Sequence, residues 1–183
     1  MEVLQGCERL SLRYGCVRIQ HTEGVKVEAT IREATNGDLA AIVQLIPRLR
    51  AFGPVRHRSE EVLDAGERRT IERYFEARPP GSQLWVAEHP AKGVSGVAYA
   101  ERMIDYFTQA PHGHLGILAV AERAEGLGIA RALMRQVEDW SRENGYSILT
   151  LNVFAANERA RAFYERAGFE IDTLRYAKPL RHR

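Results

Sequence analysis

The chain has 183 residues, with 26 basic and 24 acidic side chains, a formal net charge of +2 and 45% hydrophobic residues. This length and composition fit one globular domain with a sizeable core. The near balance of charges gives no argument for nucleic acid, and no apolar run approaches the roughly 18 residues that a membrane helix needs, so neither is expected as a partner.

Residues 1–27 show weak periodicity and no clear helix caps, so we expect an N-terminal extension of unclear structure before a domain over residues 28–183. They lack the basic start and the apolar stretch of about 7–15 residues that a secretory signal needs. Cys7 and Cys16 are the only cysteines. We expect free thiols in a cytoplasmic protein, although the two could pair. No group of residues has metal-binding spacing, so no metal is expected.

The first half of the domain predicts a strand followed by two helices. Apolar residues alternate over 27–34, which is typical of a strand. Residues 35–46 place apolar side chains at helical spacing after a capping Thr or Asn, and Pro47 should end or kink this helix. A second helix is expected from the N-cap Ser59 to Phe75, before two prolines and a glycine.

The second half predicts strands interrupted by two further helices. It begins with a hairpin of strands over 83–89 and 94–104, followed by a strand beginning near His114. A helix over 127–143, closed by Asn144 and Gly145, leads to a strand over 147–154. The last elements are a helix from Asn157 as N-cap to Gly168 at C′, and one or two closing strands over 169–180. This order predicts an α+β fold, an α/β sandwich in which helices flank one central, mixed and mainly antiparallel sheet.

The stretch AERAEGLGIARALM joins a strand to the longer of these helices through Gly126 and Gly128. The first amides of a helix have no partner within the helix, and the helix dipole makes that end positive. Glycine lets an anion approach such amides without a Cβ in the way, and Arg123 adds a positive charge. The stretch therefore indicates either a cradle for an anionic ligand or a plain strand-to-helix turn. Arg131 stands where a dinucleotide fingerprint needs a small residue, and the Gly-Lys-Ser/Thr of a P-loop is missing.

A second motif lies about 30 residues later, in the stretch NERARAFYERAGFE over residues 157–170. With both motifs, the sequence resembles the GNAT superfamily of coenzyme A-dependent N-acetyltransferases. RAEGLG resembles the acyl-CoA pyrophosphate loop of that family, R/Q-x-x-G-x-G/A. The later stretch resembles its closing signature, N-x-x-A-x-x-(aromatic)-Y-x-x-x-G-F. The resemblance extends over about residues 28–180, and the family has the element order predicted above.

This resemblance implies that acetyl-CoA is the acyl donor. Its pyrophosphate would lie on the amides from Ala124 to Ala130, and a backbone N–H between Leu118 and Val120 would bind the acetyl carbonyl, where negative charge develops. The residues expected to bind the coenzyme are Leu118, Ala119, Val120, Arg123, Ala124, Glu125, Gly126, Leu127, Gly128, Ile129, Ala130, Asn157, Ala160, Phe163 and Tyr164.

The resemblance also implies that Tyr164 is the general acid that protonates the leaving sulfur. A thiol has a pKa near about 8.5 and a tyrosine near about 10, so the transfer is chemically reasonable. Without the motif, Tyr164 and Phe163 would be interpreted as aromatic core residues at helical spacing.

The general base cannot be assigned by resemblance, because Ile117 stands where many relatives have a carboxylate. A nearby group could act through a water molecule. The candidates are Glu101, Asp105, His112 and His114, each of which could equally be an ordinary surface residue. The segment that carries them also contains Tyr106 and Phe107, so it predicts either an aromatic wall for a cationic amine or a variable surface hairpin.

The expected activity is transfer of an acetyl group to a primary amine of a small molecule or a protein, by direct attack on the thioester and a tetrahedral intermediate. The alternative is a non-catalytic acyl-CoA-binding or sensory domain, which the isoleucine at position 117 favours. A basic run over residues 48–58 only weakly suggests an acidic acceptor group. The fold does not define the acceptor. A homodimer is a candidate assembly, because members of such a family often dimerise.

Overall fold

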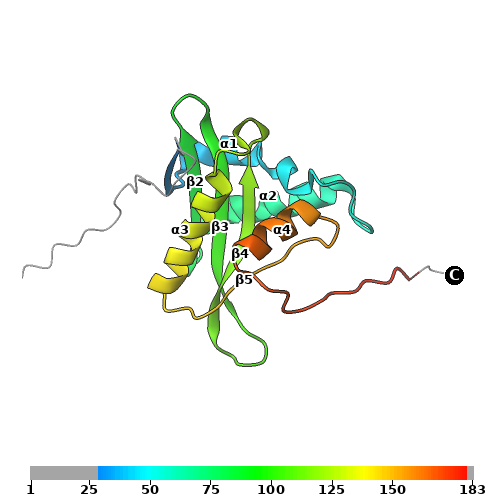
Figure 1. Cartoon of the computed structure of the whole chain (residues 1–183). Coiled ribbons are helices and arrows are strands. Elements are labelled where there is room, and N and C mark those ends of the chain that lie inside the picture. Colours follow the sequence, from blue (N-terminus) through cyan, green and yellow to red (C-terminus); the bar gives the residue numbers. More distant parts are fainter. Residues whose placement is uncertain (1–28, 181–183) are drawn as a thin grey trace, which may run out of the picture.

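The computed structural model describes residues 29–180, which fold around one five-stranded sheet (Figure 1). The strands are β1 (Thr30–Glu33), β2 (Ser82–His89), β3 (Gly93–Ile104), β4 (Pro111–Val120) and β5 (Leu149–Leu151). The helices are η1 (Asn36–Asp38), α1 (Leu39–Val43), η2 (Ile46–Arg50), α2 (Glu60–Ala77), η3 (Glu122–Ala124), α3 (Ile129–Glu143) and α4 (Glu158–Arg166), where η marks a 3-10 helix.

The sheet follows chain order from β1 to β5 and is mainly antiparallel. The first four strands pair antiparallel in succession, and only β4 and β5 run parallel, since α3 crosses over between them. The prediction of an α+β fold with a mixed, mainly antiparallel sheet is therefore confirmed. The hairpin between β2 and β3 is also confirmed, with its turn at residues 90–92.

Helices cover both faces of the sheet (Figure 1). On one face the ring of Tyr74 in α2 packs edge-on against Tyr99 in β3, with centroids 5.9 Å apart. On the other face Trp140 in α3 packs against Trp85 in β2, with centroids 6.0 Å apart. The close approach of α3 requires a glycine, because a Cβ on Gly96 would lie 2.8 Å from a methyl carbon of Ile129. The apolar stripe of α3 is thus held directly on the sheet.

Three helix ends match their predicted capping residues. The Ser59 hydroxyl accepts a hydrogen bond from the Val62 amide at the start of α2, and the Asn157 side chain accepts one from the Ala160 amide at the start of α4. Gly168 follows the C-cap Ala167 of α4 with a φ of +91°, the left-handed conformation that favours glycine at this position.

Several predicted boundaries differ from the structure, among them the strand expected over 147–154, of which only Leu149–Leu151 form β5. The helix expected over 35–46 is divided into η1, α1 and η2, and α1 ends four residues before Pro47. Pro47 lies in the first turn of η2, where its missing N–H costs no hydrogen bond. The strand expected from near His114 begins at Pro111, because β4 continues its pairing with β3 as far as Ile104.

The closing strands expected over residues 169–180 are wrong, since this segment has no strand in the structure. Its alternating apolar residues include Ile171, Leu174 and Tyr176, which are all largely exposed. Alternation predicts a strand only where a sheet edge offers backbone partners. The adjacent strand β5 has three residues, so the edge next to this segment is short.

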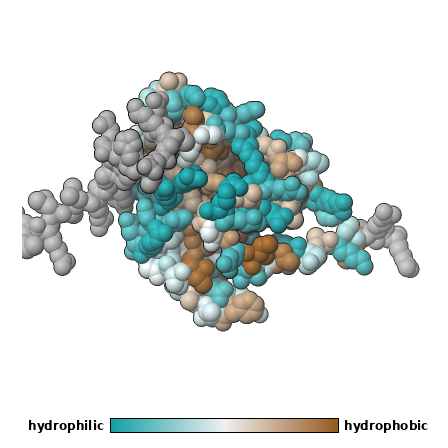
Figure 2. Space-filling model, in the orientation of Figure 1, coloured by the Kyte–Doolittle hydropathy of each residue, from teal (hydrophilic) through white to brown (hydrophobic). Residues whose placement is uncertain are grey.

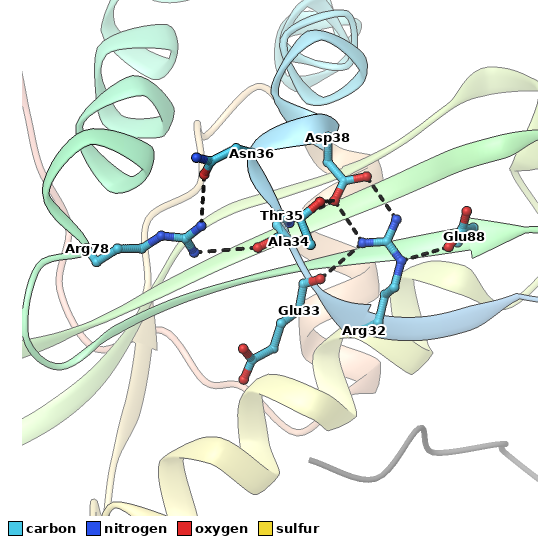
Figure 3. A network of polar contacts seen from close by, with 8 residues as sticks. All are labelled: Arg32, Glu33, Ala34, Thr35, Asn36, Asp38, Arg78 and Glu88. Carbon is cyan, nitrogen blue, oxygen red and sulfur yellow. Dashed lines mark hydrogen bonds and ion pairs between the residues drawn. The ribbon is translucent and has the colours of Figure 1, made fainter. Parts of the chain in front are cut away.

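A polar network ties β1 to η1 and β2 (Figure 3). The Arg32 guanidinium donates to both carboxylate oxygens of Asp38 at 2.8 Å and to Glu88 at 2.7 Å. The Thr35 amide and hydroxyl donate to the same Asp38 carboxylate. Asp38 is buried, yet the hydrogen bond from Arg32 lowers its pKa to about 2. The network therefore fixes the start of the chain segment that leads from η1 through α1 to η2.

Candidate active site

The cleft of the molecule opens where β4 and β5 separate. Their parallel pairing covers only Gly113–Leu115 against Leu149–Leu151. Beyond Leu115, β4 continues to Val120 without a strand on this side in the described part of the chain. The cleft has a volume of about 1240 Å³, above the range of about 300–1,000 Å³ typical of single-ligand sites. Figure 2 shows a hollow with an apolar floor and a mostly hydrophilic rim near the start of α3.

The loop between β4 and α3 forms one end of this cleft. Gly126 and Gly128 have φ values of +75° and +77°, a left-handed conformation that glycine adopts without strain. Gly128 is the N-cap of α3, so the amides of the first turn beyond it have no partner within the helix. A Cβ added at Gly126 would meet no heavy atom within 4 Å, so the space beside the loop is open. The loop can therefore accept an anion on its backbone amides.

The structure brings together nearly all the residues that the sequence predicts for coenzyme binding. Those that line the cleft are Leu118, Ala119, Val120, Ala124, Glu125, Gly126, Gly128, Ile129, Ala130, Asn157, Ala160, Phe163 and Tyr164.

Arg123 and Leu127 are the two predicted residues that do not line the cleft. The Arg123 guanidinium donates to the carbonyl oxygens of Lys92 and Val94, at 3.0 and 3.1 Å, and so secures the turn between β2 and β3. The Leu127 side chain packs against the hydrophobic core. Their sequence positions fit the loop motif, but their side chains hold the loop in place from behind.

Five arginines that sequence reasoning did not assign to the site line the same cleft. They are Arg48, Arg131, Arg135, Arg159 and Arg166. The spacing of Arg131 and Arg135 by four residues places them on one face of α3, which was a readable signal. Arginine suits phosphate groups because its planar fork donates two parallel hydrogen bonds.

Glu125 is the acidic residue of the loop, and two of these arginines neutralise it. Arg159 forms an ion pair with its carboxylate at 2.9 Å, and Arg48 bonds to it from η2. The pKa of Glu125 is lowered by these contacts, with Arg159 as the main cause. The negative charge in the loop is therefore balanced before an anionic ligand arrives.

Tyr164 lies on α4 with its ring between two other aromatic residues. The ring centroids of Phe163 and Phe169 are 5.4 and 5.8 Å away. Burial raises the pKa of Tyr164 to about 12, so its hydroxyl is protonated at neutral pH and can donate a hydrogen bond. Within the part of the chain that the structure describes, this hydroxyl has no protein partner, and Tyr164 lines the cleft.

The candidates for the general base lie outside the cleft lining. Asp105 accepts hydrogen bonds from the amide and the hydroxyl of Thr108, at 2.7 and 2.8 Å, and closes the turn between β3 and β4. Tyr106 and Phe107 at this turn are 83% and 82% exposed. Figure 1 shows this hairpin at the end of the sheet opposite the glycine loop. The structure therefore does not bring this segment to the cleft as an aromatic wall.

The remaining candidates, Glu101, His112 and His114, lie closer to β5 on β3 and β4. Glu101 accepts a hydrogen bond from the Tyr99 hydroxyl at 3.1 Å, and Nδ1 of His112 is buried without a partner.

His114 is the candidate with a link to the cleft, since its neighbour Asn152 lines it. Its Nδ1 lies 2.8 Å from the Thr150 hydroxyl and its Nε2 lies 3.4 Å from Nδ2 of Asn152. Because the Thr150 hydroxyl in turn contacts the carbonyl oxygen of Gly113, the network assigns the proton to Nδ1. Burial lowers the pKa of His114, so the ring is neutral at pH 7 and both nitrogens are engaged.

Another part of the cleft lining comes from side chains that sequence reasoning missed. Leu49 and Phe52, at and after the end of η2, line it with Glu67 from α2 and Phe154 from the segment after β5. The rings of Phe52 and Phe154 are in contact, with centroids 5.6 Å apart. Burial raises the pKa of Glu67. No local motif marks these residues, because they come from three separate segments.

No group of three or more His, Cys, Asp or Glu side chains among residues 29–180 is arranged to hold a metal ion. None of the helices in the same range is long and apolar enough to cross a bilayer. Cys7, Cys16 and the predicted N-terminal extension lie outside the described residues.

A loop of free amides at a helix N-terminus, beside the open edge of a mixed sheet, defines a class of α+β proteins whose cleft can accept an anionic ligand. The chain belongs to the acetyltransferase (GNAT) family, whose family model matches residues 48–169. The resemblance inferred from the two sequence motifs is therefore confirmed.

Two curated relatives are similar to part of this chain. It is 41% identical over 88 residues to a 5-NmdU N-acetyltransferase from Pseudomonas phage PaMx11, which covers 48% of this chain and 57% of that protein. It is 34% identical over 99 residues to the N-acetylaspartate synthetase of Rattus norvegicus, which covers 54% of this chain and 31% of that protein. The matches therefore span about half or less of these relatives' length.

Among solved structures, a putative acetyl transferase from Pyrococcus furiosus is similar with a TM-score of 0.66 and 23% sequence identity, over 84% of this chain and 100% of that chain. At this identity the likeness shows a shared fold.

Proposed function

We propose that the protein is an N-acetyltransferase that moves the acetyl group of acetyl-CoA to a primary amine. The observation that carries this proposal is the cleft itself, which is lined together by the glycine loop, Tyr164 and the unpaired end of β4. The family match and the name of the phage relative, an N-acetyltransferase, support an enzyme rather than the alternative of a non-catalytic acyl-CoA-binding domain.

The donor site follows from the groups that line the cleft. The loop amides from Gly126 to Ala130 bind the pyrophosphate of acetyl-CoA, with support from the arginines of α3 and α4. The pantetheine arm then runs between the splayed strands. An unpaired backbone N–H in the stretch Leu118–Val120 donates to the acetyl carbonyl oxygen and stabilises the charge that develops there.

The transfer is direct and proceeds through a tetrahedral intermediate. The neutral amine attacks the thioester carbonyl carbon, a C–N bond forms, and the C–S bond breaks as the intermediate collapses. The acceptor's ammonium group loses one proton to solvent before the attack, and the attacking nitrogen loses a second as the intermediate collapses. The Tyr164 hydroxyl donates its proton to the leaving sulfur and regains one from solvent. No cysteine or serine lines the cleft within the described residues, which supports direct transfer over an acyl-enzyme.

The acceptor is proposed to be a small-molecule amine, because the acceptor end of the cleft is a recess between η2, α2 and the segment after β5. Residues 28–183 are proposed to form the transferase domain. A cytoplasmic location and a homodimer stay part of the proposal, the first because acetyl-CoA is supplied there. Size-exclusion chromatography with light scattering tests the second.

Two measurements test the proposed activity. Isothermal titration calorimetry with acetyl-CoA should show binding at micromolar level, and release of free thiol with a panel of primary amines should show turnover. Binding without thiol release for any amine would support the non-catalytic alternative instead. Absence of acetyl-CoA binding would contradict both functions.

A further inference from the structure

We propose that the Glu67 carboxylate binds the ammonium group of the acceptor, and that the acceptor is a primary amine carried on an apolar or aromatic body. This proposal rests on the proposed function, since it concerns the second substrate of the same cleft. It names a residue of α2 that no sequence motif marks.

Glu67 differs from most of the other acidic residues of α2 in having no partner among the described residues, and from the equally unpaired Glu76 in lining the cleft. Asp64 and Glu60 pair with Arg50, and Glu72 pairs with Arg68. Glu67 has no hydrogen bond or ion pair with any residue in the described range 29–180, and it is half-buried at the cleft. A carboxylate that is partly removed from water without a partner destabilises the fold. No cation among residues 29–180 pairs with Glu67 to offset this cost, so a cationic ligand is the fitting partner.

The charges around Glu67 favour a cation there. Asp64, one turn earlier on α2, is the charged group that acts on it, and both effects on Glu67, burial and Asp64, raise its pKa. From η2, Arg50 is held by Asp64, and Arg48 is held by Glu125 and the carbonyl oxygen of Val120. The helix α1 and the exposed end of β4 contain no charged residue. A positive charge on the ligand therefore meets no free cation from η2.

The walls beside Glu67 indicate what carries the amine. Leu49, Phe52 and Phe154 line this end of the cleft, and the two phenylalanine rings are in contact. Aromatic faces attract a cation, and apolar side chains gain free energy by covering an apolar body. A polyamine would bring further charges into these walls, and an amino acid would bring a carboxylate next to Glu67. The geometry therefore favours a monocationic amine such as an arylalkylamine.

The test compares Glu67→Gln with Glu76→Gln in the full-length protein. Glu76 lies on the same helix but is exposed and does not line the cleft, so it is the matched control. Turnover is followed by thiol release at saturating acetyl-CoA, with 2-phenylethylamine as the probe. Because a hydrogen bond to a charged group is lost, KM for the amine should rise about 10- to 100-fold in Glu67→Gln, with a smaller change in kcat. Glu76→Gln should leave both constants unchanged.

Two further readouts separate binding from a structural role. Acetyl-CoA affinity by calorimetry should be the same in wild type and Glu67→Gln. The melting temperature of Glu67→Gln should be equal to or above that of the wild type, because the substitution removes an unpaired, partly buried charge. Glu67→Asp, which withdraws the charge by one methylene, should have an intermediate KM.

Each contrary result has a defined meaning. An unchanged KM in Glu67→Gln, with normal wild-type turnover, overturns the role of Glu67 and leaves the transferase function intact. A wild-type preference for spermidine or aspartate over 2-phenylethylamine overturns the proposed class of acceptor. Failure of the wild type to bind acetyl-CoA overturns the transferase function, and this proposal with it.

Discussion

The two ends of the cleft are built in different ways. The donor end uses the backbone of one continuous loop, in which Gly126 and Gly128 expose amides at the start of α3. The acceptor end uses side chains from three segments, namely the end of η2, the middle of α2 and the stretch after β5. A site formed by backbone amides is encoded in the sequence by a local pattern of glycines. A site made from scattered side chains exists only after the fold has brought them together, so it can vary while the donor end stays the same.

Tyr164 lines the same cleft, and its removal should have the largest effect. In Tyr164→Phe we expect kcat to fall by about 100-fold or more, because the leaving sulfur loses its proton donor. The affinity for acetyl-CoA should hardly change, since the ring still packs between Phe163 and Phe169. Steady-state kinetics and calorimetry measure the two quantities. Unchanged turnover would remove Tyr164 from the acid role.

The acceptor end depends on the Asp38 network, which fixes the run leading to η2. Asp38→Asn should lower the free energy of unfolding by about 2 kcal/mol at pH 7. Arg32 and Thr35 would then donate to a neutral amide instead of a buried carboxylate. The pKa of Asp38 is about 2 in the folded protein against an ordinary value of 3.8. The contribution is therefore present above about pH 4 and lost as the pH falls toward 2.

Urea unfolding at pH 7 and between pH 4 and 2 measures this stability. The difference between wild type and Asp38→Asn should shrink as the pH falls through that window. A constant difference across the window would show that the charge on Asp38 does not stabilise the fold.

Gly126→Ala tests whether the donor end is formed by backbone. Its Cβ would enter the open space beside the loop and keep phosphate away from the amides, so we expect acetyl-CoA affinity to fall by about 10-fold. Gly145→Ala is the matched control, because Gly145 has a φ of +74° and equally open surroundings but lies at the other end of α3. Both variants carry the same backbone strain. Equal affinities in the two would contradict the cradle.

Arg123→Ala should have the smallest effect on acetyl-CoA affinity, and it tests whether this arginine contacts the phosphate. Its guanidinium bonds to two carbonyl oxygens of the turn between β2 and β3, so acetyl-CoA affinity should change by less than about 3-fold. Arg131→Ala, which removes a side chain from the cleft itself, should weaken binding more. Titrations of both variants at two salt concentrations compare the two arginines. A larger loss of acetyl-CoA affinity in Arg123→Ala than in Arg131→Ala would indicate that Arg123 contacts the phosphate, as its sequence position suggests.

The cleft lining around the glycine loop could be predicted almost residue by residue, because helix caps, glycine turns and strand alternation are local properties. Arg123 shows where this reasoning stops, since the motif defines its position but the partner of its side chain lies some 30 residues away in the chain. The closing strands fail for a related reason. Residues 169–180 have the right alternation, but a strand also needs a partner edge.

The acceptor end could not be predicted because its signals are non-local. Glu67 is one of six acidic residues in α2, and nothing in the sequence distinguishes it from Glu72 or Glu76. Only the packing of α2 against η2 shows that it alone faces the cleft without a cation. Asp105 shows the converse, since a carboxylate followed by two aromatic residues fits an amine site by composition, yet in the structure it closes an exposed turn.

Arg48 has a consequence for attempts to redesign this protein. Its guanidinium bonds to the carbonyl oxygen of Val120 and pairs with Glu125, so one side chain of the acceptor end braces the donor loop. A library that varies Arg48 to obtain a new amine preference would also shift coenzyme affinity, and selection would mix the two effects. Leu49 and Phe52 carry no such bond to the loop within the described residues. They are the positions at which acceptor choice can be altered independently.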